Sequence, residues 1–298
     1  MNMSDLPGLR YNEPMARHVS WRAGGHARRF YQPADVSDLC AFLRTLLADE
    51  PLLFVGLGSN LLVRDGGFNG TVLFTHHALT GVGVVDAYRS PGCVPGFRFR
   101  AGAGVPAPHL ARFVAKHGGS GAEWMAGVPG TIGGALAMNA GCYGGETWNH
   151  VLTVQTVDRF GVLRERTPDD YEIGYRHVRL KAGTEEWFVS ARFQFEPGDE
   201  RTAMLRIREL LAKRVASQPL NQPNAGSVFR NPPGDHAARL IESCGLKGFT
   251  VHGAQVSPKH ANFIVNLGSA TAAAIEGVID HVQATVAART GVQLVPEV

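Results

Sequence analysis

The spacing of apolar residues along the chain predicts short strands interspersed with helices. Apolar residues recur at helical spacing over residues 35–50, and Asp35 lies where a capping residue is expected. Similar signals predict further helices at residues 107–117, 200–216, 236–244 and 271–290. Apolar runs and period-two alternation predict strands at residues 29–31, 52–55, 61–63, 71–74, 97–101, 151–157, 162–165, 187–195, 262–267 and 292–295. Strands that follow one another this closely favour an antiparallel or mixed sheet, and therefore the α+β class.

Glycine is concentrated in one stretch, residues 127–146, where seven of the twenty residues are glycine. Average usage would place about one or two there. These glycines are interleaved with apolar residues, which is typical of closely packed backbone and not of a flexible linker. Main-chain N–H groups in such a segment can bind an anion, most often a diphosphate. The alternative is a tight crossing of two elements, and the local residues leave both interpretations open.

A second glycine loop, residues 56–60, follows the buried strand at 52–55 and adds two short polar side chains to its N–H donors. Neither loop contains the Gly-Lys-Ser/Thr of a P-loop. Residues 102–107 fit the letters G-x-G-x-x-A between a strand and a helix. A dinucleotide fingerprint also needs an acid at the end of a second strand, and Glu123 stands at that distance but in no strand. We therefore reject that fingerprint.

Composition limits the classes of protein that the chain can belong to. Its 298 residues allow about two domains. A hydrophobic content of 44% and a charged content of 18% are typical of a globular protein. The net charge of +3 does not indicate a nucleic-acid partner, but it suits a small anionic substrate. No secretory signal and no apolar stretch of transmembrane length is present, so we expect a cytoplasmic protein with no membrane partner.

Cysteine spacing gives no sign of a metal site. The four cysteines have no C-x-x-C pair and no histidine at metal-ligand spacing; they are Cys40, Cys93, Cys142 and Cys244. We expect reduced thiols and no bound metal.

Three polar residues are candidates for chemistry, and each has an ordinary alternative. Ser227 lies in a loop rich in Asn, Pro and Gly, residues 218–232, but it also fits a turn or N-cap serine. Arg176 stands between aromatic residues, or is a surface arginine. Glu297 follows an apolar run, or is a frayed terminal acid. Residues and spacing alone therefore reach an α+β protein that binds a diphosphate-containing ligand, and do not reach a reaction.

Eight short stretches together resemble the UDP-N-acetylenolpyruvoylglucosamine reductase family, the flavoenzymes that make UDP-N-acetylmuramate for bacterial cell walls. They are residues 20–25, 56–63, 127–146, 175–176, 224–232, 238–248, 259–266 and 296–297. They occur in family order over nearly the whole chain. The chain resembles the shorter subgroup, which lacks a tyrosine-bearing loop. Leu57 stands where the family often has the middle one of three glycines.

This resemblance implies a three-part architecture. Residues 1–75 and 76–198 would form two FAD-binding subdomains of the vanillyl-alcohol-oxidase type. Residues 199–298 would form an α+β substrate-binding domain whose last strand packs back toward the flavin site. The implied cofactor is noncovalent FAD, with NADPH as co-substrate in the same cleft as the UDP-sugar, in a protein that we expect to be monomeric. The cofactor-binding residues would be Gly56, Leu57, Gly58, Ser59, Asn60, Leu61, Gly127, Val128, Pro129, Gly130, Ile132, Gly133, Gly134, Asn139 and Gly141.

The resemblance also implies roles for the three candidates. Ser227 would give a proton to the substrate, while Arg176 and Glu297 would stabilise the charge that develops on it. Substrate binding would fall to Tyr175, Asn224, Arg230 and Asn262. Two alternatives remain open at this point. One is an oxidase of an alcohol or sugar with FAD attached through Cys142 or a nearby histidine, and the other is a non-catalytic nucleotide-binding protein.

Overall fold

The computed structural model describes residues 6–85 and 97–298, which form two compact units. Unit 1 comprises the described residues up to Leu9 together with Tyr31–Gly56 and Val72–Lys213. Unit 2 comprises Arg10–Phe30, Leu57–Thr71 and Arg214–Val298. Each unit combines several separate stretches of chain. The three consecutive domains expected from the sequence, residues 1–75, 76–198 and 199–298, stay a prediction.

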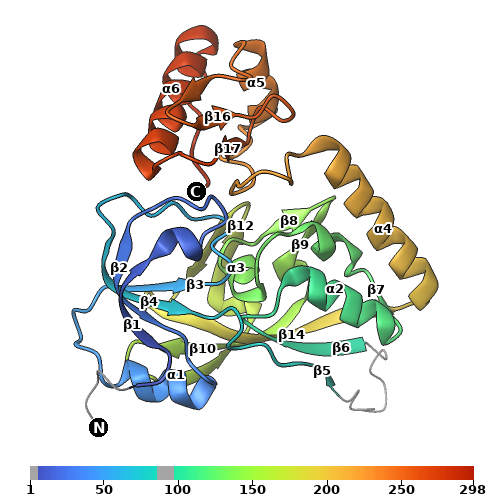
Figure 1. Ribbon diagram of the computed structural model, residues 1–298. Coiled ribbons are helices and arrows are strands. Elements are labelled where there is room, and N and C mark those ends of the chain that lie inside the picture. Colours follow the sequence, from blue (N-terminus) through green and yellow to red (C-terminus); the bar gives the residue numbers. More distant parts are fainter. Residues whose placement is uncertain (1–5, 86–96) are drawn as a thin grey trace. The chain divides into compact units, whose positions relative to one another are not determined.

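The larger sheet of unit 1 is antiparallel throughout, in the order β11-β10-β14-β6-β5 (Figure 1). Its strands are β5 (Val82–Val85), β6 (Phe97–Gly102), β10 (Val151–Asp158), β11 (Leu163–Arg166) and β14 (Glu186–Pro197), and β7 (Gly119–Ser120) pairs with the end of β14. Strand β14 buries Val189, Ala191 and Phe193 on one face, as its alternating sequence predicts. The sequence predicts an antiparallel or mixed sheet, and this sheet is antiparallel.

A second sheet has the order β1-β2-β4-β3. Its strands are β1 (Leu9–Pro14), β2 (His26–Tyr31), β3 (Leu52–Val55) and β4 (Phe68–Phe74). The strands predicted at 29–31, 52–55 and 71–74 are confirmed.

The helices of unit 1 cover its sheet and complete its core. They are α1 (Val36–Leu43), α2 (Ala107–Lys116), α3 (Ile132–Ala137) and most of α4 (Glu200–Ser217), with the short 3-10 helices Glu123–Gly127, Thr147–His150 and Pro168–Asp170. Helix α3 contacts β14 and β6 directly (Figure 1). Helix α1 begins at the predicted cap, Asp35, but ends before residue 50. Its end follows from Thr45, whose N–H and hydroxyl both bond Phe42 O and tighten the chain into a turn.

Two small hairpins complete unit 1. One pairs β12 (Tyr171–Gly174) with β13 (His177–Leu180), and the other pairs β8 (Gly141–Cys142) with β9 (Gly145–Glu146). Neither hairpin is predicted from the sequence, because strands of two to four residues with exposed faces carry little hydrophobic periodicity. The three cysteines within the described residues, Cys40, Cys142 and Cys244, are not joined in disulfide bonds; Cys93 lies outside those residues.

Unit 2 is built around a three-stranded antiparallel sheet covered by helix α6 (Figure 1). Its elements are β15 (Thr250–Val251), β16 (Ala254–Val256), β17 (Ile264–Asn266), α5 (Ala237–Ser243), α6 (Ala272–Thr290) and the 3-10 helix Met15–Arg17. Helix α6 ends at Gly291, as predicted. Gly291 has a φ of 74°, a left-handed conformation that glycine adopts readily because it has no Cβ. Trp21 joins this core, and its indole N–H donates to Ile264 O at 2.7 Å.

Two predicted strands of unit 2 are wrong. Residues 61–63 and 292–295 run without ladder partners. Leu62 packs against the core of unit 2, so this apolar run is buried by side-chain packing instead of by a sheet. Near the C-terminus only the single bridge between Phe229 and Pro296 forms. Proline has no N–H to extend a ladder.

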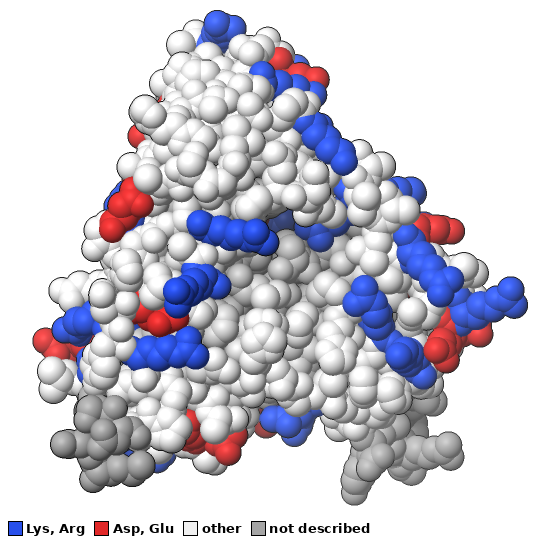
Figure 2. Space-filling model, in the orientation of Figure 1, with Lys and Arg blue, Asp and Glu red and all other residues white. Residues whose placement is uncertain are grey.

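Charged side chains are dispersed over the surface that Figure 2 shows. Lys and Arg side chains lie singly or in small groups, with uncharged atoms and acidic groups between them (Figure 2). This distribution agrees with the small net charge of +3. Among the described residues, no helix is both long and apolar enough to cross a bilayer.

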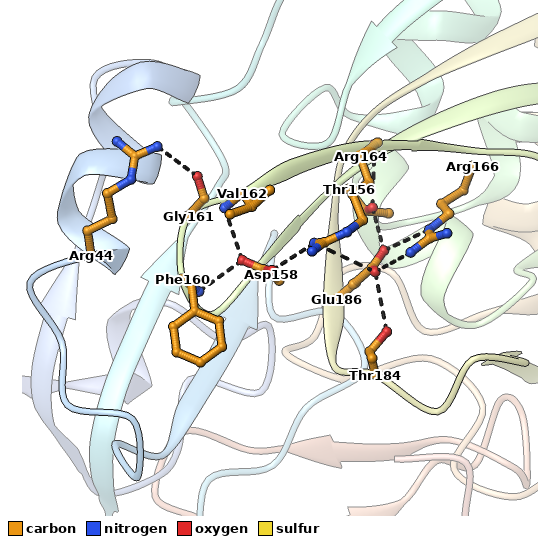
Figure 3. Close-up of polar contacts among 10 residues, drawn as sticks. All are labelled: Arg44, Thr156, Asp158, Phe160, Gly161, Val162, Arg164, Arg166, Thr184 and Glu186. Atoms are coloured by element: carbon orange, nitrogen blue, oxygen red, sulfur yellow. Dashed lines mark hydrogen bonds and ion pairs between the residues drawn. The ribbon is translucent and has the colours of Figure 1, made fainter.

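An ion-pair network ties β10, β11 and β14 together (Figure 3). The Glu186 side chain is only 3% exposed, pairs with Arg166 at 2.7 Å and accepts a bond from Thr156 at 2.7 Å. Asp158 accepts from the N–H groups of Phe160 and Val162 and so closes the turn between β10 and β11. Burial acts to raise the pKa of Glu186, but the bonds from Arg166 and Thr156 outweigh it, so that pKa is lowered.

We expect Glu186→Ala to lower the free energy of unfolding by about 3 kcal/mol at pH 7, because it leaves the half-buried Arg166 without its buried partner. A glutamate whose pKa is lowered in the folded state stabilises the protein at a pH above the ordinary glutamate pKa. This stabilisation is lost as the pH falls through the lowered pKa. The difference in free energy of unfolding between Glu186→Ala and the parent protein should therefore shrink at low pH, as measured by urea unfolding. Glu165→Ala is the control, since its pair with Arg192 is exposed at 60% and 51%. Equal losses in both variants would contradict the role of the network.

Asp65 caps helix α6 from a distant part of the sequence. Its two carboxylate oxygens accept from Ala272 N at 3.0 Å and Ala273 N at 2.9 Å. We expect Asp65→Ala to cost about 1–2 kcal/mol in urea unfolding, as loss of a helix cap does. Glu276→Ala removes only the neighbouring exposed pair with Arg64 and should cost less than about 0.5 kcal/mol. The capping role fails if the two variants unfold at the same midpoint.

Candidate functional site

The glycine-rich stretch places helix α3 directly against the chain at residues 103–105. Thr131 caps α3 with its hydroxyl, and the N–H groups of Ile132 and Gly133 donate to Val105 O and Ala103 O, both at 2.8 Å. A Cβ on Gly133 would lie 3.0 Å from the Ala103 Cβ. This close packing explains the glycine at position 133. It also means that Ile132 and Gly133 have no N–H left for a ligand.

Gly56, from the other predicted loop, lies beside the cap of α3. A Cβ on Gly56 would stand 2.2 Å from Thr131 Oγ1, so only glycine fits there. Within residues 6–85 and 97–298, the N–H groups of Gly130 and Thr131 have no protein hydrogen-bond partner. Two adjacent uncommitted donors suit a phosphate group of a bound nucleotide. Thr131 is not among the residues predicted from the sequence, although a threonine just ahead of a short apolar helix is a cap signal.

Residues 57–61 belong to unit 2, where their own contacts hold them. Gly58 has a φ of 57°, and its carbonyl accepts from Ser20 N at 3.0 Å. Asn60 donates from Nδ2 to Glu297 O at 3.0 Å. Leu57 has no positive φ, so its position tolerates a side chain in place of the glycine frequent in the family.

The rejection of a dinucleotide fingerprint at residues 102–107 is confirmed. The N–H groups of Gly102, Ala103 and Gly104 all donate to backbone carbonyls of unit 1. A Cβ on Gly104 would clash with the carbonyl oxygen of Thr75. These glycines serve packing, and the donors that a diphosphate would need are already used.

Arg176 lies in the two-residue turn between β12 and β13, with a φ of 52°. Non-glycine residues rarely adopt this left-handed conformation. Its guanidinium donates to Asn139 O at 3.3 Å and to Gly141 O at 3.2 Å, and it stands 5.1 Å from the ring centre of Tyr175. The turn therefore holds a charged side chain in a defined place at the cost of backbone strain, a combination found at functional sites.

Ser227 lies in a loop of unit 2 whose main chain is anchored by hydrogen bonds on both sides of it. Gly226 N donates to Asn224 Oδ1 at 2.9 Å, and Val228 N donates to Asn262 O at 2.9 Å. Glu297 N donates to Val228 O at 2.7 Å, which brings the end of the chain beside Ser227. The Ser227 hydroxyl itself is half-buried and has no hydrogen-bond partner among the described residues. It is thus available to a bound molecule.

The predicted substrate-binding residues of unit 2 differ in how far the protein uses their polar groups. Asn262 is 3% exposed and clamps Phe229, accepting from its N–H and donating to its carbonyl. Asn224 donates to Pro219 O and Gln222 O. Arg230 has a buried Nε with no partner among the described residues, which fits a ligand contact. Arg230 is therefore the strongest of these candidates.

Comparison with known proteins gives first a class and then a family. Residues 27–166 match a family model described as FAD binding domain. Residues 218–298 match one described as UDP-N-acetylenolpyruvoylglucosamine reductase, C-terminal domain. An FAD-binding region followed by this domain defines an α+β flavoprotein and confirms the fold class expected from the sequence.

Relatives of that name match the whole chain. One from Thiobacillus denitrificans is 58% identical over 97% of this chain and 90% of its own length. One from Alkalilimnicola ehrlichii is 57% identical over 98% and 94%. A solved structure of the reductase from Thermus caldophilus aligns with a TM-score of 0.78 at 28% identity, covering 97% and 98% of the two chains. This chain belongs to the UDP-N-acetylenolpyruvoylglucosamine reductase family, and the resemblance seen in its motifs is confirmed.

Two substitutions at Arg176 distinguish the effect of backbone strain from the effect of losing the guanidinium. Arg176→Ala and Arg176→Gly both remove the guanidinium, but only glycine adopts the left-handed turn without strain. We expect Arg176→Gly to be more stable than Arg176→Ala by about 1 kcal/mol in urea unfolding, with both variants nearly inactive. Equal stability would mean that the turn is not strained.

Proposed function

We propose that the chain catalyses the NADPH-dependent reduction of the enolpyruvyl ether of UDP-N-acetylglucosamine enolpyruvate to UDP-N-acetylmuramate, in the cytoplasm. Its family membership supports an FAD-dependent oxidoreductase of peptidoglycan synthesis. The observation that carries the proposal is the uncommitted hydroxyl of Ser227 in a loop clamped to Glu297. A group that must deliver a proton needs such freedom in an otherwise rigid setting.

The diphosphate of FAD is proposed to bind at the cap of α3. The N–H groups of Gly130 and Thr131 are the donors that fit it, and Gly56 leaves room beside them. When bound, FAD supplies the hydride chemistry, which no side chain of the protein can perform. The protein's own task is to orient the substrate, stabilise charge and supply a proton.

Ser227 is proposed to donate a proton to the α-carbon of the enolpyruvyl group. A serine hydroxyl is a weak acid, but an α-carbon that gains negative charge is a strong base, so an acidic donor is not required. The anchored backbone on both sides of Ser227 limits the positions of its Oγ. This restriction favours transfer to one carbon and one face.

Arg176 and Glu297 are proposed to stabilise the negative charge that develops in the substrate. A guanidinium offers a planar fork of donors that matches a carboxylate. Glu297, in its protonated form, would add a further hydrogen bond. Arg230, through its unpartnered Nε, is proposed to bind the UDP-sugar. Asn224 and Asn262 are proposed to shape the substrate loop, and Tyr175 to flank Arg176 through its ring.

NADPH and the UDP-sugar are proposed to use the same cleft in turn, giving ping-pong kinetics. The proposal is supported by the family resemblance and by the rejection of the dinucleotide fingerprint at residues 102–107, which leaves no separate site of that kind for NADPH among the described residues. The reaction then divides into two half-reactions that can be measured separately: reduction of the flavin by NADPH, and its reoxidation by the enolpyruvyl nucleotide.

We expect Ser227→Ala to reduce the flavin with NADPH at a rate within about twofold of the parent and to slow reoxidation by about 10²–10⁴-fold, because only the second half-reaction needs the proton. Stopped-flow absorbance of the flavin measures both steps.

Ser243→Ala is the matched control, since that hydroxyl of the same unit bonds Leu240 O on helix α5. Equal losses in both half-reactions of Ser227→Ala would refute the role of Ser227 as proton donor. The proposed function itself would be refuted if the parent protein takes up FAD but its reduced flavin is not reoxidised by the enolpyruvyl nucleotide.

A further inference from the structure

The amide of Asn139 joins three parts of unit 1 around Arg176. Its Nδ2 donates to Gly174 O at 3.2 Å and to Glu146 Oε2 at 3.0 Å, and its Oδ1 accepts from Trp148 N at 3.2 Å. Asn139 is 2% exposed, so these bonds are sheltered from water. Gly174 is the last residue of β12 before the turn that carries Arg176.

The orientation of this amide is determined by its partners. A carbonyl oxygen and a carboxylate oxygen can only accept, so the NH₂ group must face Gly174 and Glu146. The N–H of Trp148 can only donate, so it requires the amide oxygen. Turning the amide over would break all three bonds and leave buried polar atoms without partners.

The main chain beside this amide contacts the guanidinium directly. Arg176 donates to the carbonyl of Asn139 at 3.3 Å and to that of Gly141 at 3.2 Å. Gly141 pairs with Glu146 across the β8–β9 hairpin. Glu146 therefore holds Asn139 through its side chain and faces Gly141 through its backbone.

We propose that Asn139 and Glu146 are positioning residues for Arg176. Asn139 holds the turn through Gly174 and presents its own carbonyl to the guanidinium, while Glu146 fixes the amide that does so. Asn139 has a φ of 40°, a left-handed conformation that asparagine tolerates better than most residues, and this agrees with a fixed requirement at the position. The inference rests on the proposed function of Arg176 and replaces the expected direct contact of Asn139 with the cofactor.

The test compares Asn139→Ala and Glu146→Ala with the conservative Glu146→Gln, whose amide oxygen can still accept from Asn139. We expect the two alanine variants to slow reoxidation of the flavin by the enolpyruvyl nucleotide by about 10–100-fold, as a misplaced catalytic group does. Reduction by NADPH should stay within about twofold of the parent, and Glu146→Gln should recover most of the lost rate.

Coupling to Arg176 is tested by a double variant. If Asn139 acts through Arg176, then adding Asn139→Ala to Arg176→Ala should slow reoxidation no further, within about twofold. A crystal structure of Glu146→Ala supplies a readout apart from activity: the guanidinium should leave the carbonyls of residues 139 and 141, and in Glu146→Gln it should keep them.

The control is Glu172→Ala, which removes an exposed ion pair with Arg179 on the same hairpin. It should leave both half-reactions and the thermal midpoint unchanged. The proposal is overturned if the alanine variants keep full reoxidation rates, if the effects of Asn139→Ala and Arg176→Ala multiply, or if both half-reactions fall together with the melting temperature. Failure of the parent protein to be reoxidised would instead refute the proposed function, whatever the variants do.

Discussion

Close approach of main chain to main chain at the start of helix α3 is the constraint on which the predicted cofactor site depends. Gly56 lies so close to Thr131 that a Cβ has no room there, and a Cβ on Gly133 would be in very tight contact with Ala103. This packing uses the N–H groups of the first helical residues and leaves those of Gly130 and Thr131 uncommitted. Gly56 and Gly133 thus permit close packing, while Gly130 and Thr131 keep their N–H donors available for a ligand.

Unit 2 follows a different principle, because its polar site is held by hydrogen bonds that join residues far apart in the sequence. Asn60 binds the carbonyl of Glu297, and Glu297 binds the carbonyl of Val228. The end of the chain is therefore anchored without a regular strand. This anchoring supports the role proposed for Glu297, because a frayed acid could not hold a fixed position.

The charged groups of Glu186 and Arg176 are held in different ways. The buried Glu186 is matched by Arg166 and Thr156, so its charge strengthens the sheet. Arg176 instead has main-chain carbonyls at its guanidinium and a strained turn beneath it. These carbonyls help to fix where the guanidinium lies, and the role proposed for Arg176 depends on that fixed position.

Sequence alone determined the α+β class, most long elements and the family, because hydrophobic periodicity and short motifs are local properties of the chain. It also picked out Gly56, Arg176, Ser227 and Glu297 as candidates, and their roles stay predictions. It could not assign Leu62 and Val292 correctly, since apolar runs look alike whether a ladder or side-chain packing buries them. Nor could it show that the amides of Asn139 and Asn262 form hydrogen bonds with the protein's own groups. Tertiary structure decided those questions, because hydrogen-bond partners come from residues distant in sequence and only the folded chain brings them within reach.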